Sequence, residues 1–390
     1  MEKAITELLK QNKNAFYLFD IAKLKQRIRD LRKALPEGTA LAYAVKANPF
    51  LEKEIEEEVE RFEVCSPGEG RICEALHLLP EKLVISGVYK SEDFIEELVS
   101  GAYRTAIFTA ESEAQFELLK CLAGKYRCRL SVLLRVTNDS QFGMDEAIVK
   151  RLICERENTP ELQIRGLQFF SGTQKTSIKK LAREVTYLDT LISELRDEYG
   201  FETTELEYGP GFPASYFVGE EIDEPALWSA FGDLLRQMTN HPQTVLELGR
   251  AMAYPCGSFF THVVDKKTNK GINYLLVNAG MHQLVYYGQM MAMKKPVVHL
   301  CKEGATGEFT ANVCGALCSM NDILVKDLTL PQTSVGDVLC FENTGAYCVT
   351  EGIALFLSRD LPAVYLKREN GEVICVRKPM ETMELNCPKY

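Results

Sequence analysis

The chain has 390 residues, of which 46% are apolar, and its formal net charge is −10. The length predicts two domains, and the acidity argues against nucleic acid or an anionic membrane surface as the main partner. No apolar run approaches the length of a membrane span, and the N-terminal residues lack a signal-peptide core, so a cytoplasmic protein without membrane association is expected.

The thirteen cysteines are scattered through apolar segments and form no Cys-x-x-Cys pair. This distribution is typical of reduced thiols, and it argues against a disulfide framework or a zinc site. We therefore expect no bound metal, and the cysteine usage favours the same cytoplasmic location.

The chain opens with a predicted strand, Phe16–Asp20, and then a helix whose apolar residues fall on one face. Helices are also predicted over Ser112–Leu122, Asp145–Glu155 and Ser177–Tyr199. Eight predicted strands alternate with such helical patterns: Ala40–Ala44, Phe62–Val64, Lys82–Ile85, Arg104–Phe108, Leu130–Arg135, Gln163–Phe169, Glu205–Glu207 and Thr244–Leu248. Eight β/α units predict an α/β fold, a closed (β/α)8 TIM-type barrel over residues 25–256.

The pattern changes after about residue 257, where short apolar runs are separated by turn residues and long helical patterns are few. The runs are Tyr274–Val277, Val297–Leu300, Val338–Phe341 and Ala363–Leu366. They predict a mainly β barrel or sandwich domain. Because the opening strand precedes the barrel count, we expect residues 1–24 to join residues 257–390 in this domain.

The C-terminal ends of barrel strands carry the active site in folds of this class. Polar residues and glycine turns are expected there: Lys46, Cys65–Ser66, Arg135, Ser171–Gln174, Gly209–Phe212 and Glu247–Arg250. Glycine turns let backbone N–H groups approach a phosphate closely, and an arginine can add a bidentate contact. Each turn alone is typical of ordinary loops, but their joint placement favours a binding site.

Lys46 permits two interpretations. A lysine at a strand end is most often a solvated charge. The functional alternative is a lysine partly shielded from water, with a lowered pKa, that forms a Schiff base with an aldehyde. The neighbouring motifs favour the second interpretation.

The motifs at these positions resemble the signature set of the fold type III pyridoxal phosphate (PLP) decarboxylases. That family includes the diaminopimelate, ornithine and arginine decarboxylases. The resemblance runs from about residue 14 to about residue 365, and its motifs occur in family order. They are Tyr43–Asn48, Glu63–Glu69, Phe170–Gln174, Gly209–Phe212, Glu247–Arg250, Cys314–Asp322 and Gly345–Tyr347.

The resemblance implies a role for each matching position. Lys46 would bind PLP as a Schiff base, and Glu247 would pair with the pyridine nitrogen. Cys318 would be a general acid supplied by the partner subunit of a homodimer with shared sites. The remaining cofactor contacts implied are Phe170, Thr173, Gly209, Gly211, Gly249, Arg250 and Tyr347.

The reaction that the resemblance implies is decarboxylation of an amino acid. A carboxylate at the pyridine nitrogen keeps the ring a strong electron sink, whereas the related alanine racemases have an arginine there, so Glu247 favours decarboxylation. Two alternatives stay open: a PLP-dependent racemase or epimerase, and a non-catalytic PLP-binding protein. The second consists of a single barrel, so the predicted β domain argues against it.

The substrate is less defined. Candidate substrate-binding residues are Arg135, Tyr286, Ser319, Asp322 and Tyr347. Ser319 stands where many basic-amino-acid decarboxylases have an acid, and Tyr286 where diaminopimelate decarboxylases have an arginine. Phe170 also replaces a histidine that stacks on the cofactor. The segments Phe170–Gln174 and Gly280–His282 resemble those of family members in siderophore and antibiotic pathways, including those that act on carrier-protein-bound amino acids.

Overall fold

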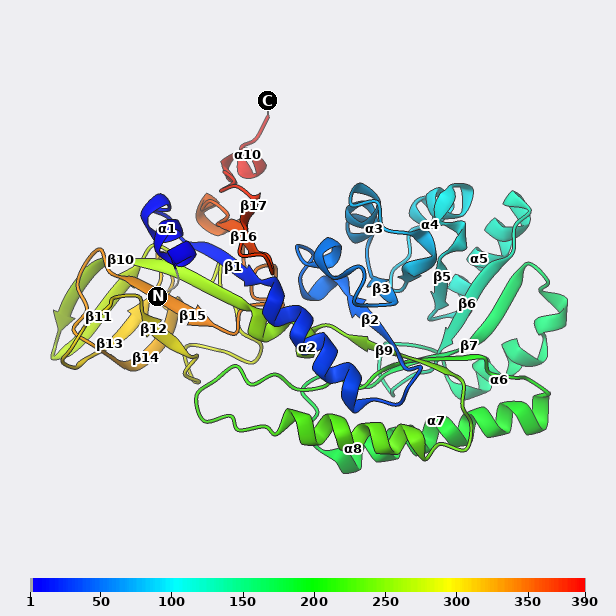
Figure 1. Ribbon diagram of the computed structural model, residues 1–390. Coiled ribbons are helices and arrows are strands. Elements are labelled where there is room, and N and C mark those ends of the chain that lie inside the picture. The colour runs from blue at the N-terminus through cyan, green and yellow to red at the C-terminus, as the bar shows by residue number, and fades with distance from the viewer. Residues whose placement is uncertain (1–2, 390) are drawn as a thin grey trace. The chain divides into compact units, whose positions relative to one another are not determined.

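Eight parallel strands close into a barrel in the computed structural model, which describes residues 3–389 (Figure 1). Each strand pairs with the next, and β2 also pairs with β9 to complete the ring. Most of their side chains are buried, as in parallel sheets covered on both faces. The strands are β2 (Ala40–Ala44), β3 (Arg61–Val64), β4 (Leu83–Ile85), β5 (Ile107–Ala110), β6 (Leu130–Arg135), β7 (Leu162–Phe170), β8 (Glu205–Gly209) and β9 (Gln243–Leu248).

The predicted (β/α)8 barrel is thus confirmed, with one strand misplaced. The prediction began a strand at Arg104, but residues Ala102–Thr105 form a 3-10 turn and β5 starts at Ile107. The helix before it ends at Ser100, so the chain needs a tight turn before it enters the barrel. The apolar run alone did not distinguish the turn from the strand.

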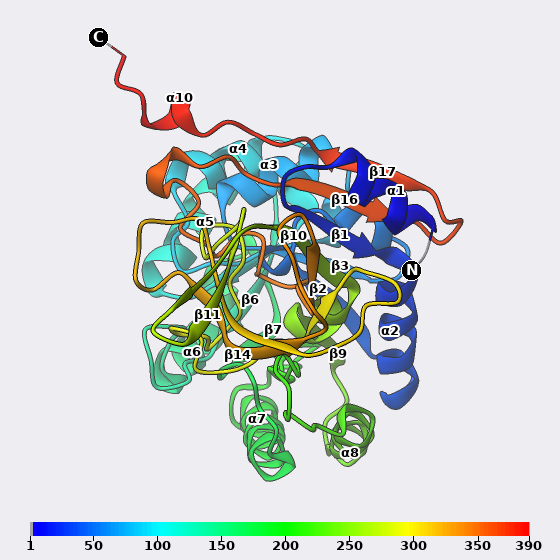
Figure 2. The ribbon, with the colours of Figure 1, turned by 90° about the vertical axis from the view of Figure 1, so that its left-hand side faces the viewer.

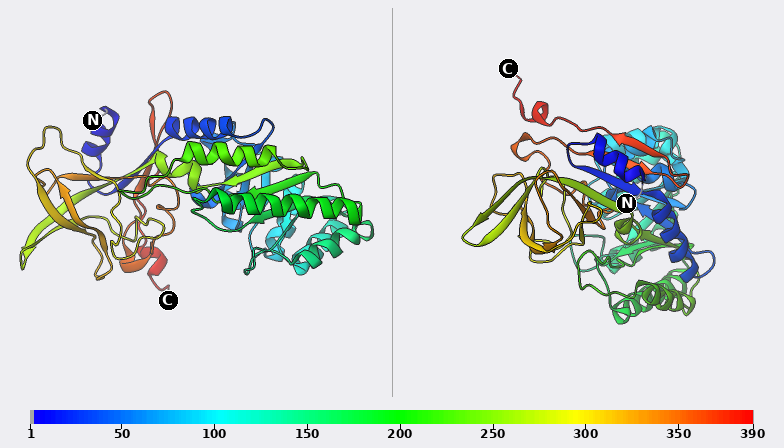
Figure 3. Two further views of the ribbon diagram at one scale, coloured as in Figure 1. Left: turned by 90° about the horizontal axis from the view of Figure 1, so that it is seen from below. Right: turned by 60° about the vertical axis from the view of Figure 1, so that its left-hand side comes forward.

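Helices alternate with the barrel strands along the chain. They are α2 (Ile21–Ala34), α3 (Pro67–Ala75), α4 (Glu92–Ser100), α5 (Glu113–Tyr126), α6 (Glu146–Cys154), α7 (Ile178–Tyr199), α8 (Glu224–Arg236) and α9 (Arg250–Ala253). The long helices α7 and α8 lie side by side (Figure 3). The sequence analysis did not predict α8, although Asp223 caps its N-terminus by accepting from Ala226 N and Pro225 occupies its first turn.

The chain divides into two units. The barrel unit contains residues 27–213 and 222–251, and the β unit contains the described residues up to 26, residues 214–221 and those from 252 onward. The boundary therefore falls inside α2. The short segment 214–221 belongs to the β unit although the barrel sequence surrounds it on both sides.

The β unit is built on a nine-stranded sheet with the strand order β14-β13-β11-β10-β1-β16-β17, to which β15 and β12 are added beside β10. Its strands are β1 (Phe16–Asp20), β10 (Gly257–Asn269), β11 (Ile272–Val277), β12 (Val298–Leu300), β13 (Phe309–Cys314), β14 (Ile323–Leu330), β15 (Val338–Glu342), β16 (Ala363–Lys367) and β17 (Val373–Arg377). Two short helices complete the unit, α1 (Lys3–Gln11) and α10 (Met383–Asn386).

The opening strand β1 lies between β10, with which it is antiparallel, and β16, with which it is parallel (Figure 2). This confirms the expected pairing of the opening strand with strands from the end of the chain. Leu8 of α1, Phe16, Leu18, Phe260 and Ala363 pack into one apolar core, so the N-terminal helix covers the same face. Burial of these side chains, which come from distant parts of the sequence, holds the unit together.

No helix in residues 3–389 has both the length and the apolar character needed to cross a membrane.

Candidate active site

Lys46 lies at the C-terminal end of β2, in a 3-10 turn formed by Val45–Ala47. The flanking Val45 and Ala47 are buried, whereas the Lys46 side chain is 42% exposed. Lys46 Nζ lies 2.7 Å from Glu63 Oε2 and 3.3 Å from Cys65 Sγ. The lysine is thus accessible and is oriented by two groups from the adjacent strand end.

Glu63 is buried beside this lysine and is ionised. Burial opposes its ionisation, but the Lys46 ammonium and a hydrogen bond from the Cys65 thiol hold its pKa below the usual range. Burial and the neighbouring Glu63 carboxylate raise the pKa of the Cys65 thiol well above its ordinary value. Cys65 therefore acts as a neutral hydrogen-bonding group at this end of the barrel.

Charged side chains occupy the interior of the barrel at alternating strand positions. Residues two apart on a strand share a face, so Arg61 and Glu63 of β3 point the same way, as do Glu205 and Glu207 of β8. Arg61 is bonded to Glu205, and its guanidinium lies 3.4 Å from Glu207. Arg165 adds a second ion pair to Glu205 at 2.8 Å. Each buried carboxylate in this series therefore has a cation or a hydrogen-bond donor nearby.

Glu247, near the C-terminal end of β9, is linked to this series through Gln168. Gln168 Nε2 donates hydrogen bonds to Glu247 and, at 3.3 Å, to Glu207 Oε1. The two carboxyl groups are close enough for each to affect the pKa of the other. Burial and the Glu247 charge raise the pKa of Glu207 well above its usual value.

Charged groups around Lys46 affect the pKa of Glu247. Burial and then the Glu63 carboxylate raise the Glu247 pKa, while Glu207, Lys46 and Arg135 act in the opposite direction. Lys46 is thus close enough to Glu247 for their charges to interact. The barrel places the predicted Schiff-base lysine and the predicted pyridine partner in one electrostatic environment.

Two glycine turns meet beside this group. A Cβ on Gly211, whose φ is +64°, would lie 1.9 Å from Gly172 O, so the loops after β7 and β8 can approach only if position 211 is glycine. Arg250 Nε donates to Thr173 Oγ1 at 3.3 Å. A cation and a hydroxyl group beside closely packed glycine turns are an arrangement that can bind a phosphate.

Phe170, at the end of β7, lies against the backbone of the next strand. A Cβ on Gly209 would be 2.5 Å from Phe170 Cδ2, so this glycine makes room for the ring. Gly249 precedes Arg250 directly after β9, and it adds a fourth glycine to this end of the barrel, besides Gly172, Gly209 and Gly211.

Arg135 is buried and engaged within the barrel unit. Its guanidinium lies 2.8 Å from Glu111 Oε1 and 4.9 Å from the centre of the Phe142 ring. Both Glu111 and Arg135 side chains are at most a tenth exposed. The structure therefore gives Arg135 the surroundings of a fixed internal charge.

The remaining predicted residues lie in the β unit. Cys318 is exposed in the turn between β13 and β14, and Ser319 is half-buried next to it. Asp322 accepts from Met281 N at 2.7 Å and Leu317 N at 2.8 Å, so each of its carboxylate oxygens holds a backbone N–H. These contacts give Asp322 the task of shaping the turn that presents Cys318.

Tyr286 is buried in the same unit, and its hydroxyl donates to Glu342 O at 2.7 Å. Tyr347 is half-buried and has a φ of +66°, an uncommon conformation for a residue with a side chain. Its carbonyl accepts from Thr350 N and Glu351 N, and these bonds hold that conformation. The two tyrosines therefore differ in exposure, and Tyr347 is the more accessible.

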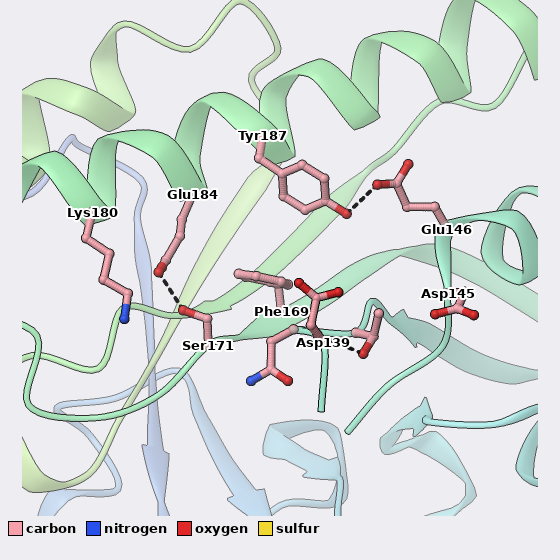
Figure 4. A pocket seen from close by; sticks show the side chains of 10 residues that line it. Asp139, Asp145, Glu146, Phe169, Ser171, Lys180, Glu184 and Tyr187 are labelled. Atoms are coloured by element: carbon pink, nitrogen blue, oxygen red, sulfur yellow. Dashed lines mark hydrogen bonds between the residues drawn. The ribbon is translucent and has the colours of Figure 1, made fainter. Parts of the chain in front are cut away.

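A cavity of about 530 Å³ opens beside the loop that follows β7 (Figure 4). Carboxylates of Asp139, Asp145, Glu146 and Glu184 line it, together with the ammonium group of Lys180. Such an acidic lining disfavours a phosphate. Ser171 and Glu184, which border the turn 171–174, also line this cavity.

The sequence analysis assigned no role to four residues that the structure brings into this group: Glu63, Cys65, Gln168 and Glu207. Glu63 and Cys65 stand two residues apart, as do Glu205 and Glu207, a spacing that places each pair on one face of an extended segment. In residues 3–389, no group of three His, Cys, Asp or Glu side chains is arranged to hold a metal ion.

Comparisons with known proteins identify relatives of this chain. A family model described as "Pyridoxal-dependent decarboxylase, C-terminal sheet domain" matches residues 16–345. The chain is 26% identical over 402 residues to an L-glutamyl-[BtrI acyl-carrier protein] decarboxylase of Niallia circulans, covering 96% of this chain and 93% of that protein. It is also 26% identical over 396 residues to a diaminopimelate decarboxylase of Aquifex aeolicus, covering 96% and 91%. A crystal structure of AQ1208 from Aquifex aeolicus superimposes with a TM-score of 0.84 at 25% identity, covering 98% of this chain and 92% of that one.

Proposed function

The chain belongs to the pyridoxal-dependent decarboxylase family, and from that premise we propose how its residues divide the work of decarboxylating an amino acid. The observation that carries the proposal is that the candidate residues lie together at the C-terminal end of the barrel strands. Lys46 follows β2, the glycine turns follow β7 and β8, and Glu247 and Arg250 lie at the end of β9. Because all eight strands are parallel, these groups share the end where barrel enzymes place their sites.

The residues present fit the cofactor. Gly211 has space for a backbone turn and none for a Cβ, which suits a loop that must approach a phosphate. Thr173 and Arg250 would bind the phosphate, and Lys46 would bind the aldehyde. Phe170, in place of the family histidine, would offer an apolar ring face and no proton.

When bound, PLP supplies the electron sink for loss of the substrate carboxylate as CO2. Glu247 would hold a proton-bearing ring nitrogen, with Gln168 donating a hydrogen bond that favours its charged form. Glu63 and Cys65 would orient Lys46 Nζ. Cys318 Sγ would deliver the proton that replaces the lost carboxylate.

For the substrate, we propose an amino acid whose distal end needs no charged partner on the Cys318 motif. Asp322 has both oxygens bonded to backbone N–H groups, Tyr286 donates to a backbone carbonyl, and Ser319 is neutral. An aminoacyl group on a carrier protein meets this description, and the Niallia circulans relative is named for such a substrate. Diaminopimelate, for which the Aquifex aeolicus relative is named, is the competing candidate.

The test is CO2 release by the PLP-loaded enzyme on a panel of substrates. It contains free glutamate, diaminopimelate, lysine, ornithine and arginine, and glutamate attached to an acyl carrier protein. We expect turnover of a substrate without a distal charge, with the carrier-linked group favoured over free glutamate. Efficient turnover of diaminopimelate would refute the substrate proposal, and racemisation without CO2 would refute the proposed reaction.

We further propose a cytoplasmic homodimer in which Cys318 of one subunit serves Lys46 of the other. The support is the exposed position of Cys318 on a turn that Asp322 holds in shape. Mixing inactive Lys46→Ala and Cys318→Ala chains should restore about a quarter of wild-type activity, because random exchange yields half mixed dimers with one intact site each. No recovery after verified subunit exchange would refute the shared site.

A further inference from the structure

A buried ion pair lies next to the residues proposed to bind the phosphate, Gly211, Thr173 and Arg250, which we call the phosphate cradle. Lys175 Nζ is 2.6 Å from Glu184 Oε2, and the two side chains are only 3% and 11% exposed. Lysine and glutamate are rarely buried to this degree unless they are paired and their position is needed. Lys175 follows directly after the turn 171–174, and Glu184 lies on α7.

The pair is part of a closed set of hydrogen bonds. Glu184 accepts from Ser171 Oγ at 2.5 Å (Figure 4), and also from Tyr208 OH at 2.5 Å. Lys175 Nζ donates a second bond to Ser171 Oγ at 2.9 Å. Burial and the Glu184 carboxylate raise the pKa of Tyr208 well above its usual value, so its hydroxyl remains a donor. The charges of the pair are therefore balanced and solvated by protein groups.

The same lysine contacts the second glycine turn. Its backbone N–H donates to Gly211 O at 2.9 Å. Its Cε occupies the space next to Gly211, 2.9 Å from where a Cβ would be. Gln174, immediately before it, has a φ of +57°, a conformation that persists only where surrounding contacts hold it. Lys175 thus fastens the loop after β7 both to α7 and to the turn after β8.

We infer that Lys175 and Glu184 are positioning residues for the cofactor phosphate: their ion pair fixes the loop 171–175 against Gly211, so that the donors of the cradle are in place before the phosphate arrives. This inference rests on the proposed phosphate cradle. Loosening the pair should weaken binding of the phosphate and leave binding of the aldehyde unaffected, because Lys46 is held by separate contacts on β3.

The test compares the dissociation constants of PLP and of pyridoxal, which lacks the phosphate, for the full-length chain freed of cofactor. Lys175→Met should raise the PLP constant about tenfold or more and the pyridoxal constant less than about twofold, since a misplaced loop weakens charge-assisted hydrogen bonds. Glu184→Gln should act in the same direction. Lys175→Arg, which keeps the charge, should recover part of the loss.

Lys180→Met is the matched control, because Lys180 is an exposed lysine on α7 that lies outside this set of bonds. It should change neither constant. If Lys175→Met fails to fold, Tyr208→Phe removes one donor to Glu184 without leaving a charge, and it should give a smaller PLP-specific loss.

The outcomes separate this inference from the proposal beneath it. If the wild-type chain binds PLP and pyridoxal equally, the cradle itself is refuted and the inference with it. If the wild-type chain prefers PLP and the Lys175 and Tyr208 variants keep that preference, only the inference is refuted. An equal loss for both ligands would mean that the pair has a general structural role, and that result also overturns it.

Discussion

Two glycines with nearly the same backbone conformation allow the cradle to be tested by substitution. Gly211 has a φ of +64° and Gly200 a φ of +59°. Gly200 ends helix α7, and no atom lies within 4 Å of the Cβ it would gain. Gly211→Ala and Gly200→Ala therefore impose similar backbone strain but differ in the contacts of the added methyl group.

The expected magnitudes follow from these contacts. A left-handed alanine costs about 1–2 kcal/mol relative to glycine, so both variants should lose roughly that much free energy of unfolding. In Gly211→Ala the methyl group would also lie 1.9 Å from Gly172 O, where contacts below 3.0 Å do not occur, so the two loops must separate by about 1 Å. Loss of one charge-assisted bond to the phosphate costs about 1.5–3 kcal/mol, which corresponds to a roughly 10- to 150-fold weaker affinity for PLP.

The assay is a titration of the cofactor-free variants with PLP, followed by visible absorbance, alongside urea unfolding of each chain. Gly200→Ala should be destabilised and should bind PLP like the wild type. Gly211→Ala should be destabilised at least as much and should bind PLP more weakly. Equal PLP affinities for the two variants would show that the loops at Gly211 and Gly172 do not form the cradle.

The other predictions concern single side chains. Glu247→Gln should leave PLP bound but slow decarboxylation on the order of 100-fold, because a preorganised charge is lost; unchanged turnover would mean that the ring nitrogen has another partner. Lys46→Ala should leave no cofactor attached to the chain after borohydride reduction, and retained label would refute its assignment. Burial raises the pKa of Glu52 to about 7 from 4.5, against a hydrogen bond from Cys73 that lowers it. The protonated Glu52 therefore stabilises the folded chain fully below pH 4.5 and loses this contribution as the pH rises through about 7, a change of up to about 3 kcal/mol. Glu52→Gln should flatten that slope in urea unfolding from pH 5 to pH 8, and an unaltered slope would contradict the assignment.

Local patterns in the sequence were sufficient for the barrel strands and for the place of Lys46. An apolar run such as Ala40–Ala44 that ends in Asn-Pro defines a strand and its end by short-range chemistry alone. In a parallel barrel, strand ends share one rim, so placing the strands also grouped the candidate residues. The strand at Ile107 was the exception, since a 3-10 turn and a strand end have similar local composition.

Long-range contacts decided what the sequence left open. The pairing partners of β1, which come from β10 and β16, depend on strands more than 200 residues away. The local sequence provided no reason to expect burial of Lys175, because it is a lysine in a polar loop. The fold nevertheless buries it between α7 and the turn at Gly211.

The acidic residues inside the barrel also show which features depend on the local sequence and which depend on the tertiary structure. The sequence determined that Glu205 and Glu207 lie on one face of a strand, because side chains alternate along an extended backbone. It did not determine that this face points inward, because only closure of the barrel brings Arg61 and Gln168 within bonding distance of these acids. Buried carboxylates are stable only when such partners surround them, and those partners come from strands that are distant in sequence.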